Sequence, residues 1–280
     1  MGRRLRIEYY GAMYHIIQRG YNREPIFKDR EDKSYLLEIL SETKEIHDFQ
    51  IFAYVIMNNH YHFAIRTFNI PISRIMHIIN TRYAKYYNSK MDRTGPVFED
   101  RYTGILVQDE SYLITLIKYI HNNPVAAKIC GSMEEYQWSS DVFYRVNMES
   151  IVDIEELLGM LSINRIDAIK KYIELMDEDI ENYQVLKDIY ERSPIIGREE
   201  FIKSMEVVDG EEEENIELDE ILMRACPSVK EYELIKEGSR KRYLTKYKKK
   251  YIEEARQIGY SYQRIGKNIG ISATSVRKIK

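Results

Sequence analysis

Hydrophobic and polar residues alternate along the first 145 positions in two patterns, one typical of strands and one typical of helices. The period-two pattern predicts strands at residues 12–22, 50–57, 61–68 and 102–108. The helical pattern predicts amphipathic helices at residues 30–49, 72–91 and 110–123. Their order along the chain predicts an α+β fold, a ferredoxin-like antiparallel sheet with helices packed on one face.

Local signals mark where these helices begin and end. Asp29 and Asp109 stand where a side-chain oxygen accepts hydrogen bonds from the first amides of a helix. Pro71 suits the opening of the second helix, and Pro124 is expected to end the third, because proline lacks a backbone N–H.

The second half of the chain has a different character. Residues 150–205 have the pattern of short helices and carry no recognisable chemistry. Nine acidic residues and no basic ones fall between 206 and 220, which predicts a solvated linker. Two short helical patterns then flank a tight turn at Gly270, with Ser272 as a helix cap, a spacing typical of a helix-turn-helix. We therefore expect a catalytic domain at 1–147, a helical and acidic linker region at 148–217, and a helix-turn-helix domain at 218–280.

The net formal charge of the 280 residues is only −3, but the charge is unevenly distributed. Thirteen basic and two acidic residues fall between positions 238 and 280. So basic a segment favours a polyanionic partner, and its helical pattern predicts binding to double-stranded DNA. The expected DNA contacts of this segment are Lys248, Lys249, Lys250, Thr274, Ser275 and Arg277.

Composition excludes several other classes of protein. Hydrophobic residues make up 44% of the chain and charged residues 31%, as in a globular protein. No apolar segment approaches the roughly 20 residues of a membrane span, and the first residues lack a signal-peptide core, so we expect a cytoplasmic protein. The two cysteines of the chain form neither a disulfide framework nor a zinc-binding motif. The 24 tyrosines reflect either a compositional bias or stacking on nucleic acid.

His60 and His62 are the most informative pair of residues. They lie two apart in an apolar strand pattern, so both imidazoles face the same side of the sheet and suit one metal ion. Two histidine ligands leave coordination positions open for a substrate. Tyr119 and Asn123 are four apart on a predicted helix and share a face. An Asn123 amide on the metal would hold the Tyr119 hydroxyl near a metal-activated phosphate.

Each motif alone has a purely structural explanation. A His-x-His pair on a strand is often structural, and Asn-Asn-Pro is a common helix ending. The two motifs together favour a catalytic site. The remaining histidines, His15, His47, His77 and His121, are expected to be structural, packing or surface residues.

Several stretches of the sequence resemble the HUH-type single-tyrosine transposases, and most closely the REP-associated tyrosine transposases. The matching stretches are residues 14–27, 53–65, 95–113, 119–127 and 136–140. Two positions depart from the family pattern: Tyr61 stands where an aliphatic residue is usual, and Asn58 stands where proline is usual.

The resemblance implies that the protein cleaves and rejoins single-stranded DNA next to hairpins. It implies a 5′-phosphotyrosine on Tyr119, a free 3′-hydroxyl, and Mg²⁺ or Mn²⁺ held by His60, His62 and Asn123. Phosphate contacts are expected at four arginines, Arg19, Arg23, Arg82 and Arg101. Relatives include dimers that exchange the tyrosine helix, so both a monomer and a homodimer stay open.

Two other functions are compatible with the sequence. A DNA-binding regulator without catalytic activity would keep the fold, and the large basic C-terminal segment favours it. A zinc-dependent hydrolase would need a third protein ligand and a general base, and the sequence contains no His-Glu-x-x-His pattern.

Overall fold

The structure, a computed structural model, describes residues 7–148, 150–178, 180, 183–210, 216–239, 241–258 and 260–279. The chain divides into two compact units, Met1–Met205 and Glu206–Lys280. Residues up to 205 contribute to one core, and the domain boundaries expected at 147 and 217 stay predictions. Positions 211–215 of the expected acidic linker lie outside the described residues.

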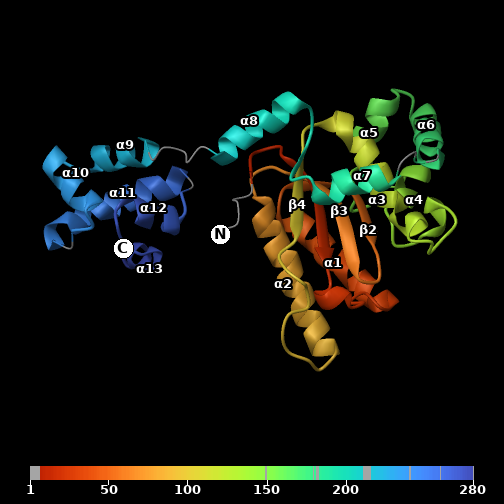
Figure 1. Cartoon of the computed structure of the whole chain (residues 1–280), viewed down its shortest axis with the longest axis horizontal. Helices are drawn as coiled ribbons and strands as arrows, with labels where there is room; N and C mark the ends of the chain where they lie inside the picture. The colour runs from red at the N-terminus through yellow and green to blue at the C-terminus, as the bar shows by residue number, and fades with distance from the viewer. Residues whose placement is uncertain are drawn as a thin grey trace. The chain divides into compact units, whose positions relative to one another are not determined.

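The first unit is built on a five-stranded sheet with the strand order β2-β3-β1-β4-β5 (Figure 1). Its strands are β1 (Met13–Arg19), β2 (Phe49–Ile56), β3 (His60–Thr67), β4 (Thr103–Val107) and β5 (Ile195–Ile196). The first four pair antiparallel, as expected. The short β5 runs parallel to β4, so the sheet is mixed.

The expected order of the first three helices is confirmed. They are α1 (Arg30–Ile46), α2 (Ile72–Lys90) and α3 (Leu113–Ala126). Asp29 caps α1 in a reciprocal capping box with Asp32. Single-turn 3₁₀ helices lie at Tyr21–Arg23, Glu110–Tyr112 and Met133–Glu135.

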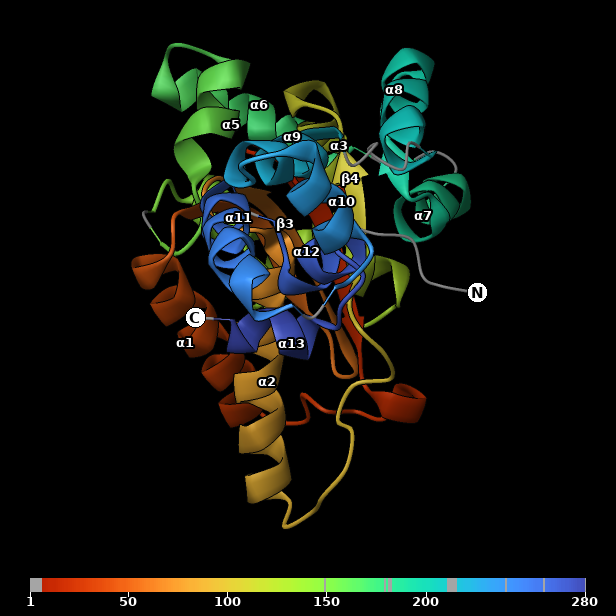
Figure 2. The ribbon, with the colours of Figure 1, turned by 90° about the vertical axis from the view of Figure 1, so that its left-hand side faces the viewer.

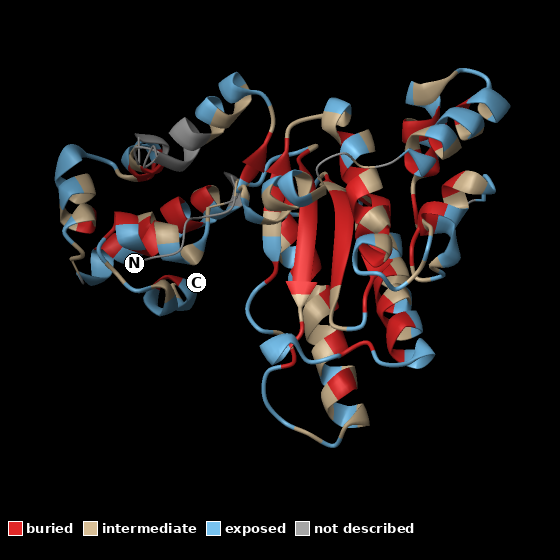
Figure 3. Cartoon of the chain, turned by 45° about the vertical axis from the view of Figure 1, so that its right-hand side comes forward, coloured by how far each residue is buried: buried red, intermediate tan, exposed pale blue. Residues whose placement is uncertain are grey.

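Helices cover both faces of the sheet, so the expectation of helices on one face was wrong. Adjacent residues of β3 show this, because successive side chains of a strand point to opposite faces. The Tyr61 hydroxyl donates to Asn80 of α2, whereas the His62 ring meets Tyr119 of α3. The central strands β1 and β3 are consequently buried along almost their whole length (Figure 3).

Helix α3 continues past Pro124, which was expected to end it. Proline cannot donate the usual helix hydrogen bond to the carbonyl four residues earlier. The Asn123 side chain compensates, because its Nδ2 donates to the carbonyl of Tyr119 at 2.8 Å and to that of Ile120 at 3.4 Å. The helix therefore runs on for half a turn.

Residues 141–205 contribute to the same hydrophobic core as the sheet. They form α4 (Asp141–Arg145), α5 (Ile154–Leu161), α6 (Arg165–Asp177), α7 (Tyr183–Arg192) and α8 (Glu199–Gly210). Asp153 joins the start of α5 to the sheet, since it accepts from the Ile51 amide at 2.7 Å and pairs with Lys44 at 2.6 Å. Helix α7 lies beside α3 (Figure 1).

The second unit is helical. It contains α9 (Ile216–Ala225), α10 (Val229–Lys236), a 3₁₀ turn (Arg242–Leu244), α11 (Thr245–Ile258), α12 (Tyr262–Asn268) and α13 (Ala273–Lys278), grouped in Figure 2. Asn268 links α11, α12 and α9 in the core, because it accepts from Tyr251 and donates to Asp219. Gly270 turns the chain between α12 and α13 with φ +64°, a conformation that favours glycine. Among the described residues no helix has the length and apolarity to cross a membrane.

Gly20 follows β1 at a close approach that leaves no room for a side chain. A Cβ there would lie 2.5 Å from the Glu24 carbonyl oxygen, whereas a Cβ on Gly159 in α5 would meet no atom within 4 Å. We expect Gly20→Ala to lower the free energy of unfolding by about 1–3 kcal/mol. The matched change Gly159→Ala is expected to raise it by about 0.5–1 kcal/mol through helix propensity.

Urea unfolding followed by the fluorescence of Trp138 measures both changes, because this only tryptophan lies in the first unit. Equal effects of the two substitutions would contradict the packing described at Gly20.

Candidate active site

The two histidines of β3 lie on one face of the sheet, as predicted. Their ring centroids are 5.1 Å apart, at an interplanar angle of 78°. His62 is fully buried, while His60, opposite Arg19 at the end of the strand pair, is partly exposed. The pair therefore reaches from the interior toward the end of the sheet.

A chain of hydrogen bonds fixes which nitrogen of His62 carries its proton. His15 on β1 lies with its Nδ1 2.8 Å from the Tyr190 carbonyl oxygen and its Nε2 2.9 Å from His62 Nδ1. A carbonyl only accepts, so Nδ1–H of His15 donates to it and Nε2 of His15 accepts. His62 must then donate through Nδ1–H, which leaves a lone pair on its Nε2.

The Nε2 of His62 is buried and has no hydrogen-bond partner in the structure. Buried polar atoms are ordinarily paired, so an orphaned imidazole nitrogen with a lone pair fits a metal ion. Burial lowers the pKa of His15 to about 3 and holds that of His62 well below its usual value. Both rings are therefore neutral, the form that a metal ligand requires.

His60 has the same arrangement through a different partner. Its Nδ1 lies 2.7 Å from Asn59 Oδ1, and the Asn59 amide nitrogen donates to the Arg23 carbonyl, which orients that oxygen toward the ring. His60 therefore donates through Nδ1 and keeps the lone pair on Nε2. Burial, then the positive charges of Arg19 and Lys187, lower its pKa to about 4.

Two lone-pair nitrogens are consistent with the divalent cation that the resemblance implies. Within the described ranges, no three or more His, Cys, Asp or Glu side chains form a metal-holding group. A further ligand must therefore come from an amide, a backbone oxygen, water or substrate. Asn123 uses its Nδ2 to donate to the Tyr119 carbonyl, so its Oδ1 is the atom left for a metal.

Tyr119 lies beside the histidine pair of its own chain. Its ring meets those of His15 and His62 edge-on, with centroids 5.7 and 6.0 Å away. The side chain is fully buried, and its hydroxyl donates to Glu191 Oε1 at 2.9 Å. Burial, and next the Glu191 charge, raise the pKa of the phenol well above its usual value.

Helix α7 is what covers the tyrosine. Tyr183 and Tyr190 stack on Tyr119 with centroids 5.8 and 5.0 Å away and interplanar angles of 19° and 20°. The same helix supplies Glu191, which holds the phenol, and the carbonyl that orients His15. The sequence assigned no chemistry to this segment.

The structure places the four expected phosphate-binding arginines in two regions. Arg19, Arg23 and Arg101 lie around the end of the sheet where His60 stands, since β1 ends at Arg19 and β4 begins just after Arg101. Arg82 lies on α2, the helix that packs on the opposite face, and forms an ion pair with Glu42. Arg82 is therefore not grouped with the histidines.

The expected DNA contacts of the second unit are mostly on its surface. Thr274, Ser275 and Arg277 are exposed on α13, and Lys249 and Lys250 are exposed on α11. Lys248 differs from them, because it is buried and its ammonium donates to the Ser239 carbonyl at 2.6 Å.

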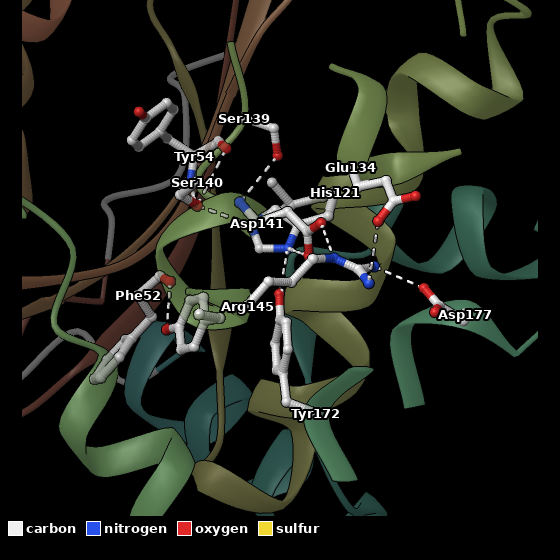
Figure 4. A network of polar contacts seen from close by, with 12 residues as sticks. Phe52, Tyr54, His121, Glu134, Ser139, Ser140, Asp141, Arg145, Tyr172 and Asp177 are labelled. Atoms are coloured by element: carbon white, nitrogen blue, oxygen red, sulfur yellow. Dashed lines mark hydrogen bonds and ion pairs between the residues drawn. The ribbon is translucent and has the colours of Figure 1, made fainter. Parts of the chain in front are cut away.

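His121, expected to be structural, anchors the tyrosine helix on its other side (Figure 4). It contacts the Tyr172 hydroxyl at 3.0 Å and Ser140 Oγ at 2.8 Å. Tyr172 in turn donates to Asp141, which pairs with Arg145 at 2.6 Å. This network holds α3 against α4 and α6 and thereby fixes Tyr119 in position.

Sequence reasoning missed His15 and Glu191 as parts of the site. His15 was expected to be a packing or surface residue, yet it is hydrogen-bonded to a candidate metal ligand. The register of β1 on β3, in which Ile17 lies opposite His62, brings His15 to this face of the sheet, and the sequence does not reveal that register. Glu191 had no sequence signal either, because it reaches Tyr119 from 72 residues away along the chain.

The site combines a sheet that carries a His-x-His pair with a facing helix that carries a tyrosine and an amide one turn apart. Residues 8–123 match the family model described as "Transposase IS200 like". The matched segment is less than half of the chain, and it contains His60, His62, Tyr119 and Asn123.

Two solved structures are similar to part of the chain. One is a REP-associated tyrosine transposase bound to a REP hairpin, with 16% identity, a TM-score of 0.44, and coverage of 55% of this chain and 92% of that one. The other, from Deinococcus radiodurans R1 and assigned as a transposase, has 18% identity, a TM-score of 0.31, and coverage of 44% and 95%. No curated protein sequence matches the chain.

Removal of the Asp141 carboxylate tests the network that anchors α3. We expect Asp141→Ala to lower the free energy of unfolding by about 1–3 kcal/mol, because the buried Tyr172 hydroxyl loses its acceptor and Arg145 keeps only its pairs with Asp177 and Glu134. The control is Arg165→Ala, which breaks the more exposed ion pair with Glu155 and should cost less than about 1 kcal/mol.

Urea unfolding followed by Trp138 fluorescence reports both free energies. A loss at Asp141 no larger than the loss at Arg165 would show that the network does not anchor α3.

Proposed function

We propose that the first unit is a metal-dependent endonuclease and transposase for single-stranded DNA, which cuts and rejoins strands beside hairpins through Tyr119. One observation carries this proposal. His60 and His62 each keep a lone pair on Nε2, and the phenol ring of Tyr119 in the same chain lies beside His62. Because the tyrosine and the histidines belong to one chain, Tyr119 acts in cis.

A cation, Mg²⁺ or Mn²⁺, would be held by His60 and His62 through Nε2 and by Asn123 through Oδ1. When bound, it withdraws negative charge from the non-bridging oxygens of a phosphodiester. Arg19, Arg23 and Arg101 then supply positive charge for the flanking phosphates.

Tyr119 supplies the nucleophile. Its phenol oxygen forms a bond to phosphorus, and the bond from phosphorus to the 3′-oxygen breaks. The phenol proton is lost to solvent and one is returned to the 3′-oxygen, so the products are a 5′-phosphotyrosine and a free 3′-hydroxyl. Rejoining reverses these steps with a 3′-hydroxyl as the nucleophile.

The second unit tethers the enzyme to double-stranded DNA. In this proposal α12 and α13 act as a helix-turn-helix, in which Thr274, Ser275 and Arg277 face the major groove. Lys249 and Lys250 add affinity that does not depend on sequence and weakens as salt rises.

One observation favours a second candidate function, a DNA-binding regulator without catalysis. The Tyr119 hydroxyl is buried beneath α7 and bound to Glu191, so no phosphate reaches it in this conformation. Such a protein would use the same basic surfaces to bind DNA and leave it intact.

A single assay separates the two functions. Incubation with a hairpin-bearing single strand and Mn²⁺ should give a covalent protein–DNA band on a denaturing gel. Tyr119→Phe should abolish that band, because phenylalanine has no oxygen to attack phosphorus. Tyr35→Phe makes the same chemical change on α1 and should leave the band intact.

A mobility shift without any covalent band would establish the regulator. A covalent band that persists in Tyr119→Phe would assign the nucleophile to another residue.

A further inference from the structure

The strongest unassigned feature of the site is the imidazole pair formed by His15 and His62. Their rings are nearly coplanar and meet edge to edge through a hydrogen bond, with centroids 5.1 Å apart and an interplanar angle of 15°, and both are fully buried. Such a pair is unusual for a core, because each ring brings two polar nitrogens that need partners. Three of these four nitrogens are paired, and only Nε2 of His62 is left.

We propose that His15 is a positioning residue of the metal site and that α7 controls it through the Tyr190 carbonyl. The proposal rests on the proposed function, since it concerns the same site. The proposal adds His15, a residue that takes no part in the chemistry itself. It also links the segment that matches the family model, residues 8–123, to helix α7, because Tyr190 lies beyond that segment.

The direction of the hydrogen bonds carries the argument. An imidazole on a metal is usually oriented by an acceptor that takes its other N–H. For His62 that acceptor is His15, which accepts through Nε2 only while its own Nδ1 holds a proton. The Tyr190 carbonyl enforces this state, so one backbone oxygen of α7 sets the proton positions on two rings.

Without His15, Nδ1 of His62 loses the acceptor that holds its proton. The proton can then lie on Nε2 with the lone pair on Nδ1, or the ring can rotate in the space left behind. Either change removes the lone pair from the Nε2 position that the metal site requires. Loss of a residue that orients a metal ligand typically costs about 10–100-fold in metal affinity.

Mn²⁺ binding, measured by electron paramagnetic resonance on the full-length protein without DNA, tests the proposal. His15→Phe, which fills the space but neither accepts nor donates, should weaken Mn²⁺ binding about 10–100-fold. His15→Gln carries both an amide donor and a carbonyl acceptor, so it should restore a large part of the affinity. Urea unfolding of both variants shows how far each change acts on the fold alone.

Three results would bear on the proposal differently. Wild-type affinity in His15→Phe would overturn it. Equal weakening in both variants, in parallel with equal loss of stability, would also overturn it, because His15 would then serve only the fold. A wild-type protein that binds no Mn²⁺, or binds it unchanged in His62→Ala, would instead contradict the metal site of the proposed function.

A second inference comes from a different observation, the burial of the nucleophile. Tyr119 is stacked between two tyrosines of α7, and its hydroxyl is held by Glu191. On the surface of α7, Val185 and Ile189 are 58% and 39% exposed, so little packs on the outside of this helix. The segment is joined to the sheet at its C-terminal side by the two-residue strand β5.

We infer that α7 is an autoinhibitory cover, which must move away from α3 before a phosphate reaches Tyr119. The contact with Glu191 stabilises the covered state in two ways. It satisfies the buried hydroxyl, and its negative charge opposes both ionisation of the phenol and approach of a phosphate. Displacement of α7 removes these effects together.

The cover is tested by a matched pair of carboxylate deletions on α7. Glu191→Ala removes the acceptor of the Tyr119 hydroxyl, and Asp188→Ala removes a carboxylate that contacts Arg192 at 3.3 Å and Gln184 at 3.5 Å, both on its own helix. In the covalent-adduct assay, Glu191→Ala should raise the initial rate about three- to tenfold, because it increases the open population. Asp188→Ala should leave the rate unchanged.

Hydrogen exchange of the metal-free protein gives an independent readout. Binding of the hairpin strand should speed exchange in residues 183–192 while it slows exchange elsewhere in the first unit. A slower rate in Glu191→Ala, or slower exchange of α7 with DNA bound, would overturn the cover and make α7 a DNA-contacting element. An absence of any protection or adduct with wild-type protein would instead contradict the proposed function.

Discussion

The candidate site depends on one short hydrogen-bond chain that runs from the Tyr190 carbonyl through His15 to His62. A backbone carbonyl has no proton to give, so in two neutral rings it determines the tautomers of both. The result is an imidazole nitrogen with a lone pair, buried and without a partner. His60 reaches the same state independently, through Asn59. The fold thus provides two neutral imidazoles, each with a lone pair on Nε2, as the candidate metal ligands.

The same helix that completes this hydrogen-bond chain also covers Tyr119, the proposed nucleophile. Helix α7 contributes the carbonyl for His15, the carboxylate for Tyr119 and two stacking rings, all from Tyr183–Arg192. Orientation of the ligands and access to the tyrosine are therefore coupled through one element. Movement of α7 would expose Tyr119 and at the same time release the acceptor that holds the tautomer of His15. Under our proposals, a bound cation keeps His62 in place once α7 has moved.

Much of the first unit could be predicted from sequence because its signals are local. Alternation along β3 placed His60 and His62 on one face, and the capping residue Asp29 placed the start of α1. The prediction that Pro124 ends the helix was wrong. The Asn123 side chain donates to the Ile120 carbonyl, which proline cannot do. Local rules also placed helices on one face only, since the sequence does not reveal which face each helix will cover.

The rest of the site depends on contacts between distant residues. His15 meets His62 only because β1 pairs with β3 in a particular register, and Glu191 meets Tyr119 only because α7 returns to α3. A lone histidine on a strand and a glutamate on a surface helix have many uses, so neither residue type identifies its role. The family resemblance supplied the expected metal and the tyrosine, but it ends before α7.

The most direct test of this account is the tautomer of His62 in the metal-free protein, measured by long-range nitrogen–proton correlation NMR on histidine labelled with nitrogen-15. We expect His15 and His62 both to carry their proton on Nδ1, with a neutral ring and a bare Nε2. A proton on Nε2 of His62, or rapid exchange between the two tautomers, would contradict the hydrogen-bond chain and with it the pre-organised metal site.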